Sequence, residues 1–344
     1  MKALLLKEYN LFAYEDVPEP ELGPHDVLVQ VKACGICGSD VHGMDGSTGR
    51  RIPPLIMGHE ASGVIAAFGD AVTGWAEGDR VTFDSTDYPL NDWYTRQGLY
   101  NLSDNRQVLG VSCADYRRHG AFAEYVSVPE HILYRVPDSV SFNQAALVEP
   151  ISVCLHALDL TPLHLHDTAL VVGSGIIGLL MVQILRAAGC HQIIAIDLED
   201  YKLAFAERLG ATIALNPRRD DIAGRVRDLT EGRGADIAFE AVGITAAVKT
   251  AVENVRKGGT VTLIGNLAPS VELPLQLVVT RQLRLQGSCG IRGEYPAALG
   301  MLEKGTINVD SLISATAPLA DGAEWFRRLY EPGNNLMKVI LNPT

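Results

Sequence analysis

The chain has 344 residues, of which 47% are hydrophobic and 20% charged, and its 29 basic and 41 acidic residues give a net charge of −12. This length is typical of about two domains of ~150 residues each, and the low charge content excludes a disordered chain. The acidic residues are spread along the chain and repel phosphate-rich partners, so we expect neither nucleic acid nor an anionic membrane surface as a partner.

The first 150 residues read as short β-strands. Apolar or alternating runs at residues 27–32, 61–68, 80–83 and 122–128 are separated by turn residues. Residues 84–118 contain tyrosines, asparagines and charges without a clear period, which predicts a long irregular loop.

From about residue 168 the pattern changes to alternating strands and helices. Runs of β-branched and aliphatic residues alternate with segments of helical length; the runs lie at residues 169–172, 193–197, 237–240 and 260–264. Such alternation predicts a parallel sheet with crossover helices. Beyond residue 285 it fades into segments that end in an apolar run at 337–341, either the end of the second domain or a return to the first.

Cysteine usage indicates a reducing environment, because the six cysteines are sparse and irregularly spaced, unlike the frameworks of small secreted domains. Near the N-terminus, four consecutive apolar residues between two lysines are too few for the ~7–15-residue core of a signal peptide. The most apolar stretch, residues 169–185, is interrupted by glycines and polar residues and is shorter than the ~20 residues of a membrane span. We therefore expect a cytoplasmic protein.

A glycine-rich turn follows the run at 169–172. The motif Gly173-Ser-Gly175-Ile-Ile-Gly178 opens an aliphatic segment. A plain turn would explain it, but the context favours a dinucleotide-binding loop: the first glycine permits a tight turn, the second lets the backbone approach a pyrophosphate, and the third lets helix and strand pack closely. The helix N-terminus then binds the phosphates. The predicted contacts are Gly173, Gly175, Ile176, Ile177 and Gly178.

An acidic residue closes the next strand. Asp197 lies 19 residues after Gly178, where a carboxylate accepts both ribose hydroxyls of NAD. The same charge repels the 2′-phosphate of NADP, and no arginine is adjacent. NAD is therefore the expected cofactor, and Lys202 is counted with the residues that bind it.

The first half contains residue types that bind a catalytic zinc ion. Cys37 lies in Gly35-Ile-Cys37-Gly-Ser39-Asp40-Val-His42, and His59-Glu60 follows 22 residues after it. The residues alone leave other interpretations open: Cys34 and Cys37 also suit a redox pair or half of a four-cysteine site, although no second pair completes one, and His59 suits a buried core histidine.

Six motifs occur in order along the chain: Gly-Ile-Cys-Gly-Ser-Asp-Val-His, Gly-His-Glu-Ala-Ser-Gly-Val, Gly-Asp-Arg-Val, Gly-Ala-Phe-Ala-Glu-Tyr-Val, Glu149-Pro150 and Gly-Ser-Gly-Ile-Ile-Gly. Together they resemble the zinc-containing medium-chain dehydrogenase/reductase family. The resemblance is closest to its sorbitol/iditol (polyol) dehydrogenase branch, because alcohol dehydrogenases usually have a cysteine in place of Glu149. It implies an α/β fold: a Rossmann doubly wound parallel sheet (151–285) inserted in a mostly-β GroES-like catalytic domain (1–150 and 286–344).

The resemblance also assigns roles at the matching positions. Cys37 and His59 match metal ligands. Glu60 and Glu149 match positions that bind the metal or hydrogen-bond its water, and one could replace the other during turnover. The metal cation lowers the pKa of the substrate hydroxyl, so that its alkoxide exists near neutral pH.

Ser39 and His42 match the family's proton relay. Ser39 passes the substrate proton towards His42 and solvent, since an imidazole suits reversible transfer near neutral pH. Hydride moves from the carbinol carbon to the nicotinamide. Outside this motif, a capping serine and a surface histidine would be the natural interpretations.

One departure from the family bears on metal content. The positions at which many relatives carry the cysteines of a structural zinc read Pro89, Asp92, Thr95 and Ser103. We therefore expect one catalytic zinc per subunit and no structural zinc. The loop would then be held by packing, with three aromatic residues as candidates: Trp93, Tyr94 and Tyr100.

Other departures bear on specificity. Sorbitol-type enzymes usually have an Arg-Tyr pair where Gly290 and Ile291 lie here, with Arg292 one residue further on, and Gly43 replaces a frequent aromatic. These differences point away from sorbitol itself and towards another polyol or sugar-derived alcohol.

The expected activity is the reversible NAD- and zinc-dependent oxidation of a secondary alcohol of such a substrate to a ketone, by a homotetramer or homodimer. Alternatives with the same site are a threonine 3-dehydrogenase, a butanediol dehydrogenase and a phosphorylated-polyol dehydrogenase; the charge of −12 argues weakly against the last. A catalytically silent NAD-binding relative is the alternative from another class.

Overall fold

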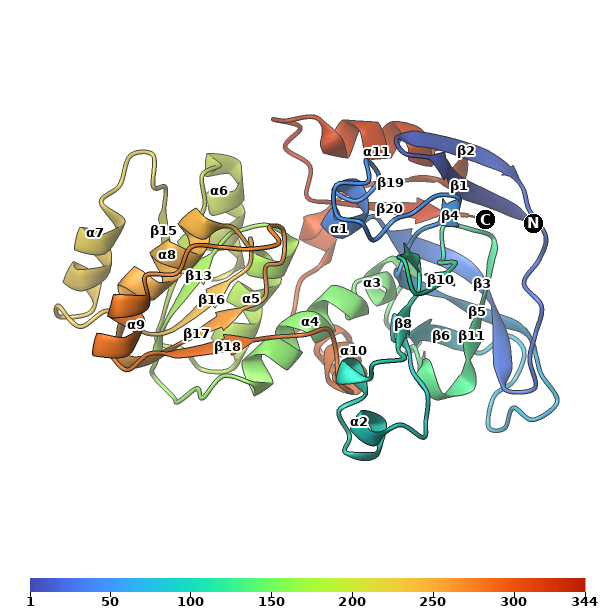
Figure 1. Ribbon diagram of the computed structural model, residues 1–344, viewed down its shortest axis with the longest axis horizontal. Helices are drawn as coiled ribbons and strands as arrows, with labels where there is room; N and C mark the ends of the chain where they lie inside the picture. The colour runs from blue at the N-terminus through green and yellow to red at the C-terminus, as the bar shows by residue number, and fades with distance from the viewer. Residues whose placement is uncertain (344) are drawn as a thin grey trace. The chain divides into compact units, whose positions relative to one another are not determined.

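The computed structural model describes residues 1–343, and the chain divides into two compact units (Figure 1). The first unit contains Met1–Ser152, Ile291–Lys304 and the chain from Val309 onward, and the second contains Val153–Gly290 and Gly305–Asn308. The chain therefore leaves the first unit and later returns to it. The boundaries between the catalytic and Rossmann domains, after residues 150 and 285, remain predictions.

The main sheet of the first unit has seven strands. Six follow the order β12-β6-β5-β3-β20-β19, and β11 also pairs with β3. The strands are β3 (Asp26–Gly35), β5 (Glu60–Phe68), β6 (Arg80–Phe83), β11 (Tyr125–Pro129), β12 (Leu133–Arg135), β19 (Ile313–Pro318) and β20 (Lys338–Asn342). The last strand, β20, pairs with β3 from the start of the chain, so the final apolar run completes the first unit's sheet.

Alternation in the sequence explains which face of this sheet is buried. Val27, Val29 and Val31 of β3 are fully buried, while the residues between them are half-buried. This period of two is the pattern of a strand with one face on a core. The alternation therefore determines which β3 side chains enter the core.

Smaller elements surround the main sheet. A second sheet pairs β1 (Lys2–Glu8) with β2 (Leu11–Asp16) and β4 (Leu55–Ile56). The helices of the first unit's segments are α1 (Gly38–Val41), α2 (Trp93–Arg96), α3 (Phe142–Ala146), α10 (Tyr295–Glu303) and α11 (Gly322–Tyr330), and α4 (Val148–Asp159) crosses the division between the units. The short 3-10 turns are η1 (Tyr100–Leu102), η2 (Glu130–Ile132), η3 (Asp310–Leu312) and η4 (Leu319–Asp321).

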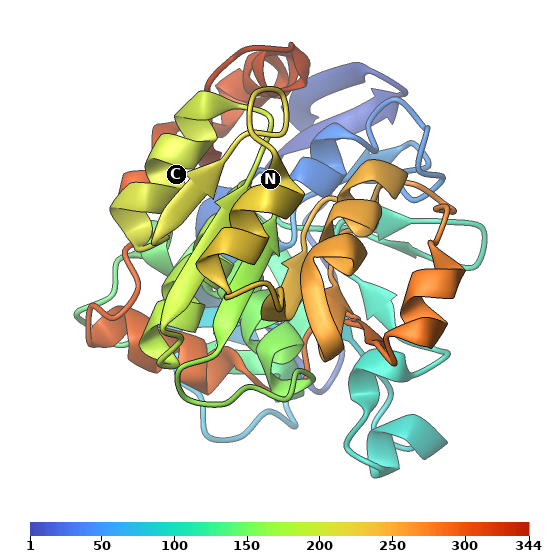
Figure 2. The same cartoon turned by 90° about the vertical axis from the view of Figure 1, so that its left-hand side faces the viewer.

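The second unit contains a six-stranded parallel sheet in the order β15-β14-β13-β16-β17-β18. Its strands are β13 (Thr168–Val172), β14 (Gln192–Ile196), β15 (Ile213–Leu215), β16 (Ala235–Glu240), β17 (Val255–Leu263) and β18 (Arg284–Gly287). Its helices are α5 (Ile176–Ala187), α6 (Asp200–Leu209), α7 (Ile222–Leu229), α8 (Thr245–Asn254) and α9 (Leu275–Thr280). Figure 2 shows helices on both sides of this sheet.

This strand order is that of the Rossmann fold, and the predicted fold class is confirmed. The apolar runs of the sequence mark the four central strands, because a strand covered on both faces is apolar throughout. The edge strands β15 and β18 were not predicted, since each is short and only partly buried. None of the helices in residues 1–343 combines the length and the apolar character that crossing a membrane requires.

The loop at 84–118 is less irregular than predicted. It contains α2, η1 and the short strands β7 (Thr86–Asp87), β8 (Gln107–Val108), β9 (Val111–Ser112) and β10 (Arg117–Arg118). Packing of Trp93 does not hold it, because this side chain is 67% exposed. Instead, the Tyr100 ring stacks on Tyr88 with centroids 4.1 Å apart, and the Tyr100 hydroxyl donates to Asp84 at 2.7 Å.

Three of the positions that replace structural-zinc cysteines hydrogen-bond to one another. Asp92 caps α2 by accepting the Thr95 N–H at 2.6 Å, and the Ser103 hydroxyl donates to the other Asp92 oxygen. One carboxylate thus joins the two ends of the segment 92–103.

We expect Asp92→Ala to lower the free energy of local opening of this segment by about 1 kcal/mol, because it removes the cap and the acceptor for Ser103. Hydrogen exchange of the Thr95 amide measures the change. Asp92→Asn, whose amide oxygen can still accept, is the matched control and should stay near wild type. Equal protection of Thr95 in the alanine variant would contradict this role.

Candidate metal and cofactor sites

Strand pairing brings Cys37 and His59 to the same end of the main sheet. Cys37 follows β3 and stands at the N-cap of α1, while His59 directly precedes β5. In the antiparallel ladder between these strands, Gly35 pairs with Glu60. This register places two motifs that are 22 residues apart in sequence beside each other.

A glycine allows the turn before His59. Gly58 has φ of +96°, and a Cβ there would lie 2.8 Å from Cys34 Sγ and 2.9 Å from the Phe122 backbone nitrogen. Both the conformation and the space therefore require glycine.

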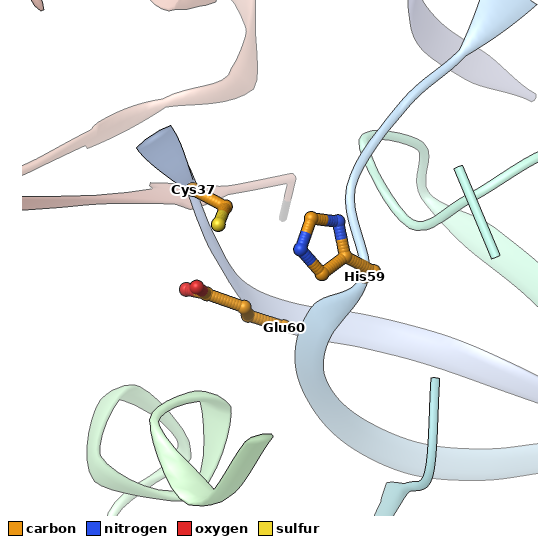
Figure 3. A group of neighbouring side chains, drawn as sticks. All are labelled: Cys37, His59 and Glu60. Carbon is orange, nitrogen blue, oxygen red and sulfur yellow. The ribbon is translucent and has the colours of Figure 1, made fainter. Parts of the chain in front are cut away.

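Cys37, His59 and Glu60 form a compact group of donor atoms. A sulfur, an imidazole nitrogen and a carboxylate oxygen all lie within 4.8 Å of one another, and Figure 3 shows the three side chains facing a common space. His59 and Glu60 are buried. Three such protein donors with a fourth position left for water or substrate are typical of catalytic Zn²⁺. The residues present therefore fit zinc.

Asp40 lies behind the His59 ring. It is fully buried, and its Oδ1 is 3.5 Å from His59 Nδ1, a buried atom with no hydrogen-bond partner among residues 1–343. Burial lowers the pKa of His59, but the negative charges of Asp40 and Cys37 outweigh that effect and hold it well above its usual value. The surroundings of the ring are thus strongly negative, which favours a bound cation. A carboxylate behind a histidine ligand also fixes its ring orientation.

Lys338 neutralises Glu60. This lysine on β20 is 2% exposed, and its Nζ donates to the two Glu60 oxygens at 2.9 and 2.6 Å and to the Ile36 carbonyl at 3.0 Å. Burial lowers the pKa of Lys338, but Glu60 and its other acidic neighbours raise it above its usual value. The ammonium group therefore stays charged and holds both oxygens of Glu60.

Glu149 lies near this group without joining it. Within residues 1–343, the donor group whose atoms lie within 4.8 Å contains Glu60 and not Glu149. The Ser85 hydroxyl donates to Glu149 Oε1 at 3.2 Å, and burial raises the pKa of Glu149 to about 7. A carboxyl group with such a pKa can gain or lose a proton at neutral pH.

Ser39 and His42 lie one helical turn apart, and both are exposed. Ser39 Oγ donates to Cys37 Sγ at 3.3 Å. The relay assigned to these two residues remains a prediction. Asp40, Arg51 and Lys338 were not predicted as site residues. For Lys338 the sequence does contain a signal, because it is a charged residue within the apolar run 337–341.

The glycine-rich loop of the second unit joins β13 to α5. A Cβ on Gly178 would lie 1.8 Å from the Gly173 carbonyl oxygen, so the helix packs on the loop more closely than any other residue allows. A Cβ on Gly175 would meet nothing within 4 Å, which leaves the backbone open to a ligand. Gly175 is also the N-cap and has no side chain to cover the helix N–H groups. Ile176 and Ile177, the first residues of α5, are half-buried. This cradle fits a pyrophosphate.

Asp197 follows β14 and is tied to the same loop. Its Oδ2 accepts the Ser174 N–H at 2.7 Å, and its Oδ1 accepts the Glu199 N–H at 2.9 Å. Each carboxylate oxygen retains a lone pair for a further hydrogen bond. Lys202 lies in the first turn of α6, where its Nζ is 5.9 Å from the centroid of the Tyr201 ring.

Comparison with known proteins identifies the family. Residues 23–138 match the model of the alcohol dehydrogenase GroES-like domain, and residues 177–304 match that of the zinc-binding dehydrogenases. Sorbitol dehydrogenase of Bacillus subtilis is 32% identical over 100% of this chain and 97% of its own length. The chain belongs to the zinc-dependent medium-chain dehydrogenase/reductase family.

Other relatives agree with the polyol branch of this family. (R,R)-Butanediol dehydrogenase of Bacillus subtilis is 33% identical over 93% of each chain. The crystal structure of galactitol-1-phosphate dehydrogenase from Escherichia coli superimposes with a TM-score of 0.91 at 27% identity and covers 100% of both chains. The protein is thus a dehydrogenase of a family whose cofactors are zinc and a nicotinamide dinucleotide, and the predicted branch is confirmed.

We expect Lys338→Met to lower the free energy of unfolding of this dehydrogenase by about 3–5 kcal/mol, because it leaves the Glu60 carboxylate buried without a cation. Urea unfolding measures the loss. The double variant Lys338→Met with Glu60→Gln removes the unpaired charge and should recover part of the stability. A single variant as stable as wild type would show that Lys338 does not neutralise Glu60.

Proposed function

We propose that this protein catalyses the reversible oxidation of a secondary alcohol of a polyol or sugar-derived substrate to a ketone, with NAD as hydride acceptor. The observation that carries the proposal is the compact group of Cys37, His59 and Glu60 beside the exposed hydroxyl of Ser39. In this arrangement, residues that can bind a Lewis-acid metal lie beside a hydroxyl that can accept a proton. Alcohol oxidation needs both.

Cys37, His59 and Glu60 would hold the zinc ion, with Glu149 as the carboxyl group that could exchange with Glu60. The metal supplies a positive charge that stabilises the substrate as its alkoxide. Asp40 orients His59, and the hydrogen bonds from Lys338 hold Glu60 in place. These contacts support Glu60 as the resident third ligand, because its donor atom already belongs to the compact group.

Ser39 and His42 would carry the substrate proton to solvent. The Ser39 oxygen can accept the proton from the substrate hydroxyl, and the exposed His42 imidazole can pass it to water. Bound NAD would supply the hydride acceptor, so each turnover would convert one alcohol and one NAD to one ketone, one NADH and one proton.

NAD rather than NADP is the proposed cofactor. Asp197 supports this choice, because its charge stands at the end of β14, where the adenosine ribose of a dinucleotide binds in this fold. Gly173, Gly175, Gly178, Ile176 and Ile177 would contact the pyrophosphate.

The substrate class follows from the relatives and from the departures noted above. The relatives' names include polyol, diol and polyol-phosphate dehydrogenases. Gly43, Gly290 and Ile291 replace residues typical of sorbitol enzymes, so we propose a polyol or sugar-derived alcohol other than sorbitol.

A homo-oligomer is also proposed. β18 is an edge strand, and nearby apolar side chains are exposed, with Leu275 63% and Val279 68% accessible. An unpaired edge beside exposed apolar groups favours a contact with a second copy of the chain. The cytoplasmic location remains a prediction from cysteine usage.

A substrate panel tests the activity. NADH absorbance with polyols, 2,3-butanediol, threonine and sugar phosphates should give the highest kcat/KM for a polyol or sugar-derived alcohol. Cys37→Ser should lose both zinc and turnover yet still bind NAD, because the dinucleotide loop lies elsewhere in the chain. Protein without metal and without activity towards any of these compounds would favour a silent NAD-binding relative.

Asp197→Asn tests cofactor choice. Asparagine keeps an oxygen that accepts the Ser174 N–H but removes the charge, so the ratio of kcat/KM for NADP to that for NAD should rise about tenfold or more. Asp197→Ala, which also loses the hydrogen bond, should weaken both dinucleotides. A wild type that prefers NADP would contradict the role of Asp197.

A further inference from the structure

Arg51 is a buried cation that none of the roles above uses. It is 4% exposed, and it lies between the two metal-binding motifs in sequence. Its Nε and Nη2 donate to Asp40 Oδ1 at 3.1 and 2.8 Å, and Nη2 also donates to Ser39 Oγ at 3.2 Å. One guanidinium therefore joins the carboxylate behind His59 to the hydroxyl beside Cys37.

The backbone around Arg51 fixes the direction of its side chain. Arg51 forms an isolated β-bridge with Ser112, and its Nη1 donates to the Arg50 carbonyl at 3.0 Å. A guanidinium is a rigid planar fork, so contacts on three sides leave it little freedom to rotate.

Gly43 provides the space that Arg51 occupies. A Cβ at position 43 would lie 2.6 Å from Arg51 Cγ and 2.9 Å from the Ser39 carbonyl oxygen. The first of these atoms lies near the base of the arginine side chain and the second is backbone, so neither can move away easily. Arg51 and a side chain at position 43 therefore exclude each other.

The hydrogen bonds of Ser39 define what Arg51 does. A hydroxyl has one proton and two lone pairs. Its proton is donated to Cys37 Sγ at 3.3 Å, and Arg51 occupies one lone pair. The remaining lone pair lies on an exposed side chain and can accept a hydrogen bond from a substrate hydroxyl.

We propose that Arg51 is a positioning residue for alcohol oxidation: it holds the Ser39 hydroxyl as an acceptor for the substrate proton and locks Asp40 behind His59. The inference rests on the proposed function. The positive charge of Arg51 also favours the loss of the proton from the substrate, because negative charge develops next to Ser39 as the substrate O–H bond breaks. As Ser39 takes the proton from the substrate, its own proton leaves Cys37 Sγ and passes to solvent through His42, so Ser39 ends each transfer unchanged.

Kinetics on the best substrate of the panel test this role. Arg51→Gln should lower kcat about 10–100-fold, with KM changed less than about threefold and zinc retained, because an orienting contact is lost but the ligands remain. Arg51→Lys keeps a charge without the fork and should recover only part of kcat. Arg50→Gln alters an exposed neighbouring arginine and is the matched control, expected at wild-type rate.

Double variants separate positioning from folding. If Arg51 acts through Ser39, Arg51→Gln should add little to the loss in Ser39→Ala, since the two residues act as one unit. Gly43→Ala should reproduce the Arg51→Gln loss and add little to it. The role would be contradicted if the decreases in kcat of Arg51→Gln and Ser39→Ala multiplied in the double variant, or if kcat fell in proportion to the bound zinc. Either result would mean that Arg51 is structural only.

A spectroscopic readout does not depend on turnover. In the cobalt-substituted protein, the thiolate-to-metal absorption reports the hydrogen bond to Cys37 Sγ. This band should shift alike in Arg51→Gln and Ser39→Ala and stay unchanged in Arg50→Gln. An inactive wild type would contradict the proposed function, whereas an unshifted band in Arg51→Gln would contradict the role of Arg51.

Discussion

The ion pair between Lys338 and Glu60 is the contact on which the candidate metal site at the end of the main sheet depends. It links β20, near the end of the chain, to the first residue of β5, and both side chains are buried. Two further acids lie in the same region, Asp40 fully buried and Glu149 half-buried. Without a fixed cation, several acidic groups would share a low-dielectric space, which costs free energy.

Two cations divide this acidic region between them. Lys338 engages both oxygens of Glu60, while Arg51 engages Asp40. The two residue types suit these different roles, because the ammonium group is a compact charge held in the protein interior, whereas the guanidinium fork reaches two acceptors at once. The site therefore contains two fixed positive charges, which partly compensate its buried acidic groups.

The sequence predicted the parts of the site that depend on local chemistry. Gly173, Gly178 and Asp197 stand at fixed offsets from a strand and a helix, so a short window of sequence locates them. Lys338 and Arg51 could not be placed that way, because Lys338 reaches Glu60 across 278 residues and Arg51 reaches Ser39 through a loop without periodicity. The exposure of Trp93 likewise depends on how the 84–118 loop folds back, which no local pattern specifies.

Each unit contains a carboxylate that contacts more than one group of its candidate site: Asp197 in the second unit and Asp40 in the first. Asp197 accepts the Ser174 N–H of the glycine-rich loop, and in the proposed function its charge also opposes a 2′-phosphate. Removing the Asp197 carboxylate therefore changes both the geometry of the loop and the charge beside it. The two effects are separated only by a substitution that keeps the oxygen acceptor and removes the charge. Asp40 is subject to the same logic, because it contacts His59 and Arg51 through a single oxygen, Oδ1. A substitution at either acid thus reports on a network, and its effect belongs to the group of residues rather than to one side chain.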